Sequence, residues 1–505
     1  MRQRHALTVA LLGLLALAIG CNSMQTSSAI LRYQQGEFEE ADSLCGEALR
    51  VNPNDGEAYF YRALSQSMLR NYSSAYENFR KAAELKPDRA KMAQQNIDHN
   101  FAEVFNNGVE ASQRDETELA IEYFTTATQA NPENPAGYTN LAKAYWTKAE
   151  KLRNYAKEDF LANATLAVDN FEIGLSKETE AEKREETARA LTAVLGNLYI
   201  ESEGEAREPY LTKYRSVTGE LGQLFGPHES FARVLFDKAE NLRANKRKEE
   251  TYRDYYVYAG EAYGKAADIR RDLGVTDDNT VNVPLFAGIA YLNSEMYDEA
   301  AKYLNMTVQL DPNLEQAWFY MQFSYYKAGK YDEAIKAGLF IDETLASTDP
   351  AVFQILWQCY KEKAIAADNA GDNAGFVENK RLYEDAYINW ATYKGLADVT
   401  PTPLLSKAEQ AKEEKISKAI FEKGGIAVLE AGVSGRFIKG MLINKGTATV
   451  PYIELAIELK DAAGLSLGET FTELEDLRPG AQRNFSAAFV QEDVAGYAIK
   501  DIIVE

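Results

Sequence analysis

A chain of 505 residues is longer than one typical domain, and its 46% hydrophobic and 26% charged residues are usual for folded protein, so two or more domains are expected. The formal net charge of −22 disfavours phosphate polymers and anionic lipid head groups, so nucleic acid is not an expected partner. Three cysteines in this length are too few for a disulfide framework.

The first predicted element is an apolar segment that ends at a cysteine. Arg2 and Arg4 precede about 15 mostly apolar residues, a length too short to span a bilayer as a helix and typical of a secretory signal peptide. Small residues lead from Ala18 to Cys21, which resembles the lipobox of bacterial lipoproteins, whose cysteine is lipidated and becomes the N-terminus. The resemblance implies a signal peptide over residues 1–20, lipidation of Cys21 and attachment to a membrane. An ordinary secretory cleavage beside an unmodified Cys21 is the alternative.

The residue after this cysteine bears on the location of the protein. Asn22 stands where an aspartate marks inner-membrane retention in some bacterial lipoproteins. The resemblance therefore implies a bacterial cell-envelope protein that is lipid-anchored at the outer membrane and faces the periplasm.

A period of 34 residues begins after this segment. Small residues and prolines recur at that spacing in EFEEADSLCGEALRVNPND and NYSSAYENFRKAAELKPD, as the pairs Ala41 and Ala75, Ala48 and Ala82, and Pro53 and Pro87. The pattern resembles the tetratricopeptide repeat, a pair of antiparallel helices in which small residues let the helices approach and a proline ends the second. The resemblance implies a mainly α protein built as a solenoid of helix hairpins.

Further copies of the pattern follow along the chain. Ala120 and Phe124 match it in ETELAIEYFTTATQANPEN, and two adjacent copies place Ala300 and Ala334 34 residues apart. Weaker copies with long helical insertions lie between and after these. We expect about seven or eight helix pairs in a superhelix over residues 22–396.

Cys45 lies inside the first copy of the pattern. The equivalent position of the second copy is Phe79, and the repeat family favours a bulky aromatic residue there. We therefore predict that Cys45 is a buried packing residue rather than a reactive thiol.

The composition changes after residue 396. GLADVTPTPLLSK ends the helical pattern, and AEQAKEEKISKAIFEK predicts one further helix, so residues 397–424 are expected to form a linker and a charged helix. Over residues 425–505, alternating stretches such as Tyr452 to Leu459 are broken by NKG, DAAG and RPG, which predicts short antiparallel strands. The pattern resembles a small all-β immunoglobulin-like sandwich, and Ile457 to Asp461 with the later Leu477 to Gly480 resembles the bacterial FxLYD-type domain.

Residues that could carry out chemistry are sparse. His99 and His228 are the histidines outside the predicted signal peptide, and neither has the spacing of a metal ligand. The sequence has no HExxH, CxxC, GxSxG or phosphate-binding GxxxxGK[ST] motif. Acidic pairs such as Glu39-Glu40 are expected on solvated helix faces. We therefore predict that the protein is not an enzyme and holds neither a cofactor nor a metal.

The repeat resemblance implies a protein-binding groove. In the family, positions 2, 5, 9 and 12 of each first helix line the inner face of the superhelix. Here these positions hold apolar side chains that would suit an extended or helical peptide. The alternative is that the long insertions fold into the groove and cover them. The predicted groove residues at these positions are Phe60, Leu64, Phe105, Val109, Phe319, Phe323 and Tyr326.

These observations support two hypotheses for function. The first is a lipid-anchored envelope scaffold or adaptor that binds other envelope proteins or peptides through the groove. The alternative is a surface lipoprotein that captures a glycan or small ligand, which needs aromatic platforms on an exposed rim. The tryptophans are Trp146, Trp318, Trp357 and Trp390, and Trp318, Trp357 and Trp390 fall at expected core positions.

Overall fold

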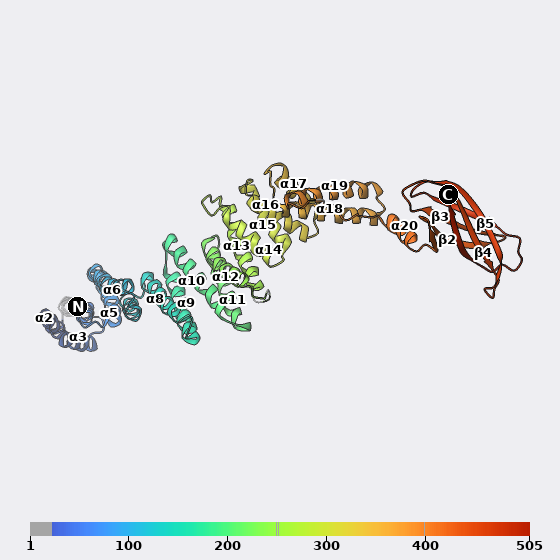
Figure 1. Ribbon diagram of the computed structural model, residues 1–505. Coiled ribbons are helices and arrows are strands. Elements are labelled where there is room, and N and C mark those ends of the chain that lie inside the picture. Colours follow the sequence, from blue (N-terminus) through green and yellow to red (C-terminus); the bar gives the residue numbers. More distant parts are fainter. Residues whose placement is uncertain (1–22, 249, 251, 398) are drawn as a thin grey trace, which may run out of the picture. The chain divides into compact units, whose positions relative to one another are not determined.

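The computed structural model describes residues 23–505 except 249, 251 and 398 (Figure 1). The predicted signal peptide and the predicted lipidation site Cys21 lie outside the described residues. The described residues divide into two compact units, one ending at Ala328 and the other beginning at Gly329. The boundary falls inside the range 22–396 for which the sequence predicts one superhelix. None of the described helices is long and apolar enough to cross a membrane.

The first unit is an array of helices in chain order. Consecutive helices pack against each other from α2 to α10 and from α12 to α16, and α10 also packs directly against α12. This confirms the predicted hairpin solenoid. The elements are α2 (Met24–Gln34), α3 (Phe38–Val51), α4 (Gly56–Met68), α5 (Tyr72–Leu85), η1 (Pro87–Arg89), α6 (Ala90–Gln113), α7 (Thr117–Ala130), α8 (Pro135–Leu152), α9 (Lys157–Lys177), α10 (Ala181–Glu201), η2 (Gly204–Arg207), α11 (Glu208–Leu221), α12 (Gly226–Ala244), α13 (Arg253–Leu273), α14 (Asn282–Asn293), α15 (Tyr297–Leu310) and α16 (Glu315–Lys327).

Proline ends the second helices of the clearest hairpins. Helices α3, α5, α7 and α15 each stop two residues before a proline, because the residue that precedes proline is forced out of the helical conformation. The small residues of the 34-residue pattern lie in the helix packing, and Ala41, Ala48, Ala75 and Ala82 are fully buried. At Gly108 an added Cβ would lie 2.7 Å from the Phe124 ring, so only glycine fits there.

The turn inside several hairpins uses one left-handed residue. Its φ is +81° at Gly36, but the same turn position holds Arg70, Asp115 and Glu295 with φ between +60° and +63°. Glycine adopts this region freely, whereas other residues adopt it at a cost in free energy. At these three turns the hairpin geometry is therefore kept although the residue at the turn disfavours the left-handed conformation.

The second unit begins with helices and ends in strands. Helices α18 (Pro350–Ala370) and α19 (Asn373–Tyr393) form a tight hairpin, and α17 (Tyr331–Glu343) packs against α18. The linker that follows is bound to this hairpin, because the Tyr383 hydroxyl donates to the Thr402 carbonyl at 3.1 Å. Helix α20 (Lys407–Ser417) begins with a capping box formed by Ser406 and Glu409.

From residue 421 onward, the described strands form two antiparallel sheets. One sheet has the order β1-β2-β3-β6 and the other β5-β4-β7. Alternate residues of each strand point between the sheets, and Leu442, Ile453, Leu455 and Ile457 are fully buried there. The strands are β1 (Phe421–Lys423), β2 (Ile426–Ser434), β3 (Phe437–Asn444), β4 (Val450–Lys460), β5 (Ser466–Leu477), β6 (Gln482–Ala488) and β7 (Gly496–Val504).

The predicted linker helix is wrong at its end. The prediction extends the helix through Phe421–Lys423, but these residues form β1 and pair with Ile426–Val428 across the turn at Gly424 and Gly425. Both glycines have positive φ, which a tight turn between antiparallel strands requires. The predicted breaks at NKG, DAAG and RPG are confirmed, since they lie at strand ends or between strands.

The outer face of the three-stranded sheet carries like charges in register. Glu454 lies directly opposite Glu473, and Glu458 lies opposite Glu469. The second pair is compensated, because Lys460 lies 3.5 Å from Glu458 and Lys500 pairs with Glu469. In the described residues no ion pair compensates Glu454 or Glu473.

Candidate protein-interaction surfaces

The predicted groove residue Phe60 is a core residue. It is 2% exposed and packs edge-on against the ring of Phe79 at 5.8 Å between centroids. The Arg89 guanidinium covers the ring at 4.9 Å, and Glu57 holds Arg89 through a bond of 3.1 Å from Nε. The prediction that Phe60 is an exposed groove side chain is therefore wrong, because η1 brings Arg89 over it.

The other predicted residues of the early repeats are half-buried. Leu64 on α4 packs at the edge of the cluster around Phe79, and Phe105 and Val109 on α6 pack at the edge of the cluster around Phe124. The Phe105 ring stacks on Phe101 at 5.1 Å. These side chains keep part of their surface exposed and are fixed in position by neighbouring helices.

The late repeats supply a second group. Phe319, Phe323 and Tyr326 lie on α16 and are half-buried. The Lys327 ammonium lies 5.4 Å from the centre of the Phe323 ring. Because α16 packs against α14 and α15, whereas α4 and α6 pack with α5 and α7, the structure brings the predicted residues together as two separate groups.

The long insertions lengthen the hairpins. The stretch after Ala142 extends α8 and α9, and the stretch after Lys361 extends α18 and α19. The rings that contact Phe105 come from α6 and α7, and not from an inserted segment.

The tryptophans are all half-buried and engaged by neighbours. The Arg153 guanidinium lies over the Trp146 ring at 5.6 Å, and Trp318 donates from Nε1 to the Pro312 carbonyl at 2.9 Å. Trp357 and Trp390 contact each other edge-on at 6.3 Å. The core prediction for Trp318, Trp357 and Trp390 is thus met only in part.

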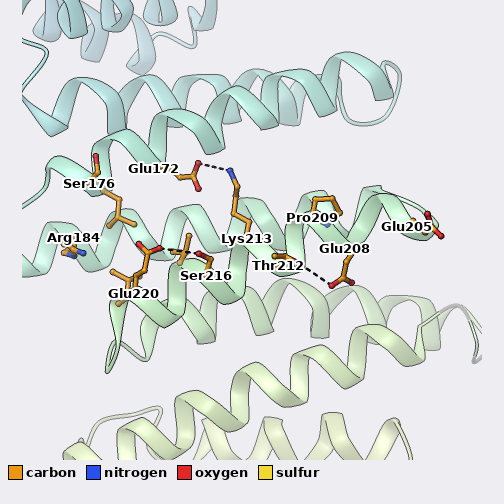
Figure 2. A pocket seen from close by; sticks show the side chains of 13 residues that line it. Glu172, Ser176, Arg184, Glu205, Glu208, Pro209, Thr212, Lys213, Ser216 and Glu220 are labelled. Atoms are coloured by element: carbon orange, nitrogen blue, oxygen red, sulfur yellow. Dashed lines mark hydrogen bonds and ion pairs between the residues drawn. The ribbon is translucent and has the colours of Figure 1, made fainter.

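A cleft of about 750 Å³, which sequence reasoning missed, lies between α9 and α11 (Figure 2). We call it the α9–α11 cleft. Its lining comes from α9, the first turn of α10, η2 and one side of α11 along its length. The lining residues are Glu172, Leu175, Ser176, Arg184, Glu205, Glu208, Pro209, Thr212, Lys213, Ser216, Val217, Glu220 and Leu221.

Helix α11 is held at a distance from α9 by its own contacts. The buried Tyr214 ring stacks on Phe231 at 3.8 Å, and its hydroxyl forms a 2.6 Å hydrogen bond with His228 Nδ1. On the other side, the Lys213 ammonium donates to Glu172 on α9 at 2.9 Å. Between these contacts, Thr212 and Ser216 offer only short side chains, and α11 has 14 residues against 21 in α9. The space between the helices therefore stays open.

The cleft has an apolar floor and an acidic rim. Leu175 and Val217 are 9% and 8% exposed and form part of the floor. Glu205 and Glu208 stand near one end of α11, and Glu220 and Arg184 stand near the other (Figure 2). The arrangement can hold an apolar group next to a positive charge.

The buried titratable groups have structural environments. Cys45 is fully buried, and burial raises the pKa of its thiol to about 12, which confirms the predicted packing role. Cys359 is also fully buried, with the same cause and value of its pKa shift. Burial, with a smaller effect of Lys265, lowers the pKa of His228 to about 4. Among the described residues, no group of His, Cys, Asp and Glu side chains could hold a metal ion.

Part of the cleft could have been found in the sequence. TKYRSVTGELG places Thr212, Ser216, Gly219 and Gly222 within one short helix and its end. Small residues at this density give a helix little side-chain volume with which to fill the space beside a longer neighbour.

The chain is similar to one repeat family and to several solved structures. A tetratricopeptide repeat family matches residues 27–90, which run from within α2 to the first residue of α6. No curated protein matches the sequence. The C-terminal part of a TPR repeat-containing protein from Cytophaga hutchinsonii is 13% identical and aligns over 58% of this chain and 97% of that chain, with a TM-score of 0.28.

Two other structures have similar scores. Pseudomonas aeruginosa pilF is 13% identical over 59% of this chain and 98% of its own, with a TM-score of 0.20. The human IFIT1 dimer with m7Gppp-AAAA is 14% identical over 65% of this chain and 73% of its own, with a TM-score of 0.26.

Proposed function

We propose that this tetratricopeptide repeat protein, whose helical array is followed by a domain of two antiparallel sheets, is a lipid-anchored scaffold of the bacterial cell envelope. Tetratricopeptide repeats generally bind other proteins or peptides, and an array of hairpins offers an extended surface without a reaction centre. Its partners in this proposal are other envelope proteins or peptides.

The observation that carries the proposal is the half-buried apolar group on α16. Phe319 and Phe323 keep part of their surface exposed on a first helix, where the repeat family binds its peptides. Apolar anchors held in fixed positions bind a partner with little loss of side-chain entropy. A peptide docked there would cover the exposed parts of both rings.

Crosslinking in native envelopes, followed by mass spectrometry, tests the scaffold proposal. The wild-type protein is expected to crosslink to other envelope proteins, and the double variant Phe319→Ala, Phe323→Ala is expected to lose at least one of these crosslinks. The matched control is Leu119→Ala, Leu166→Ala, which removes apolar side chains that are 37% and 41% exposed on second helices. Only self-crosslinks in the wild type, or equal losses in both double variants, would contradict the proposal.

The lipid anchor is proposed from the sequence around Cys21. Helix α2 begins at Met24 with Ser23 as its N-cap, so few residues separate a lipid on Cys21 from the first hairpin. The proposal therefore includes a short tether between the membrane and the start of the array.

Metabolic labelling with palmitate tests the anchor. Cys21→Ser is expected to abolish incorporation and to release the protein from the membrane fraction. Cys45→Ser is the matched control, because Cys45 is buried in α3, and it is expected to keep the label. A wild-type protein without label, or a Cys21→Ser protein that stays in the membrane at high salt, would refute the anchor and leave the scaffold proposal untouched.

A further inference from the structure

We propose that the α9–α11 cleft binds an extended polypeptide segment that carries a bulky apolar side chain next to a lysine or arginine. This site is separate from the apolar residues of the first helices, because it lies largely between two second helices of successive hairpins. It therefore adds a second binding surface to the array.

The dimensions of the cleft favour an extended segment. The lining follows α11 from Glu208 to Leu221, a length of roughly 20 Å, which an extended chain spans in about six residues. The cleft volume of about 750 Å³ gives such a segment room along α11.

The floor of the cleft selects an apolar side chain. Leu175 and Val217 lie on opposite sides, one on α9 and one on α11, and Leu221 is half-buried at the end of α11. An inorganic cation would gain nothing from these side chains, whereas a leucine, isoleucine or phenylalanine would lose its contact with water there.

The rim of the cleft selects a positive charge. Within the described residues, no ion pair involves Glu205, Glu208 or Glu220, whereas Lys213 is already paired with Glu172. Arg184 is the remaining cation of the lining. Carboxylates thus exceed available cations, and the excess attracts lysine or arginine and repels acidic segments and phosphate.

Hydroxyl groups of the lining can form hydrogen bonds with the backbone of the bound segment. The Thr212 hydroxyl reaches Glu208, and the Ser216 hydroxyl reaches Glu220, each at 3.4 Å. These distances exceed the range of strong O–H···O bonds, so both hydroxyls can turn to peptide groups at little cost.

Selection from a phage-displayed library of random hexapeptides on the purified protein tests the site. The expected enriched sequences contain lysine or arginine beside a large apolar residue. The dissociation constant of an enriched peptide is then measured by fluorescence anisotropy. Thr212→Trp, which fills the cleft from an exposed position, and Glu205→Lys with Glu208→Lys are each expected to weaken binding at least tenfold.

Two control variants match these changes outside the lining. Thr165→Trp alters an exposed threonine of α9, and Glu158→Lys reverses an exposed charge in the first turn of α9. Both are expected to leave the dissociation constant within twofold of the wild-type value. Circular dichroism on all variants checks that the helices are retained.

Several results would overturn the proposal. They are no enrichment, enrichment of acidic sequences, or a selected peptide whose affinity is unaffected by Thr212→Trp and by the two charge reversals. A selected peptide that loses affinity in the Phe319→Ala, Phe323→Ala protein but not in the cleft variants would support the first-helix surface and reject the cleft.

Discussion

At the scale of single residues, the hairpin turns require a left-handed backbone conformation that most residues disfavour. At Gly36 an added Cβ would have no neighbouring atom within 4 Å, so the role of this glycine is conformational and not steric. Arg70 adopts the same left-handed region one repeat later. A sequence pattern that expects glycine at the turn identifies the first of these turns and misses the second.

Gly36→Ala and Gly46→Ala are expected to act in opposite directions. Alanine at position 36 costs about 1 kcal/mol, because φ remains positive. Alanine at position 46, inside α3, gains about 0.5–1 kcal/mol, since a helix interior favours alanine and the nearest atom, of Arg62, is 3.8 Å away. Hydrogen exchange of the α2 and α3 amides measures both effects. Equal shifts in one direction would contradict the turn argument.

His228 is expected to make the fold around α11 sensitive to acid. Its pKa of about 4 lies below the unfolded value of 6.5, so the unfolded chain takes up the proton first as the pH falls. The stability contributed by the neutral His228 side chain is therefore fully present above pH 6.5. It is lost as the pH falls from 6.5 to 4, by up to about 3 kcal/mol. Hydrogen exchange of α11 and α12 across this range provides the measurement.

Two variants check the assignment to His228. His228→Gln should flatten the pH dependence, because the side chain that takes up the proton is gone. His99→Gln, at an exposed position of α6, should leave it as in the wild type. A wild-type-like slope in His228→Gln would assign the acid sensitivity to another group.

At the scale of single elements, helix propensity and strand pairing compete after α20. Lysine, glutamate and alanine favour a helix through the whole of AEQAKEEKISKAIFEK, and sequence reasoning extends it to Lys423. The glycine pair after Lys423 permits the turn that pairs Phe421–Lys423 with β2. This pairing makes the segment a strand and not the end of the helix. Such long-range pairing cannot be read from local propensity.

Glu454→Gln is expected to stabilise the sheet that contains β4 and β5. It removes a like-charge pair with Glu473, with a gain of about 0.5 kcal/mol that shrinks between 20 mM and 500 mM salt. Glu458→Gln is the matched control and should give no gain, because it also removes the partner of Lys460. Hydrogen exchange of the β4 and β5 amides compares the two. A greater gain for Glu458→Gln would show that in-register repulsion is unimportant here.

At the scale of the whole molecule, each part has its own core. The buried cluster between the two sheets consists of residues within 426–502, and the partly buried residues packed on it also lie within 421–504. Deleting residues 421–505 is therefore expected to leave the helices folded, with an unchanged helical signal for each remaining helical residue. Circular dichroism during thermal unfolding is the measurement, and loss of the cooperative helical transition would show a shared core.

The sequence predicts the features that recur in every repeat better than the features that occur at one place only. Ala41, Ala75 and Phe79 recur at the family spacing, and all are fully buried. Phe60 follows the same positional rule but is covered by Arg89, a contact that depends on the short helix η1. The α9–α11 cleft was not predicted, because it results from the different lengths of two helices and from the placement of α11 by Tyr214.

The two buried thiols give each compact unit an internal reporter of its opening. Cys45 lies in the first unit and Cys359 in the second, and both are fully buried and almost entirely protonated at neutral pH. An alkylating reagent reaches a thiol of this kind only when the surrounding structure opens. In a Cys21→Ser background, the two alkylation rates therefore report separately how often each unit opens, in an otherwise native sequence and without an added label.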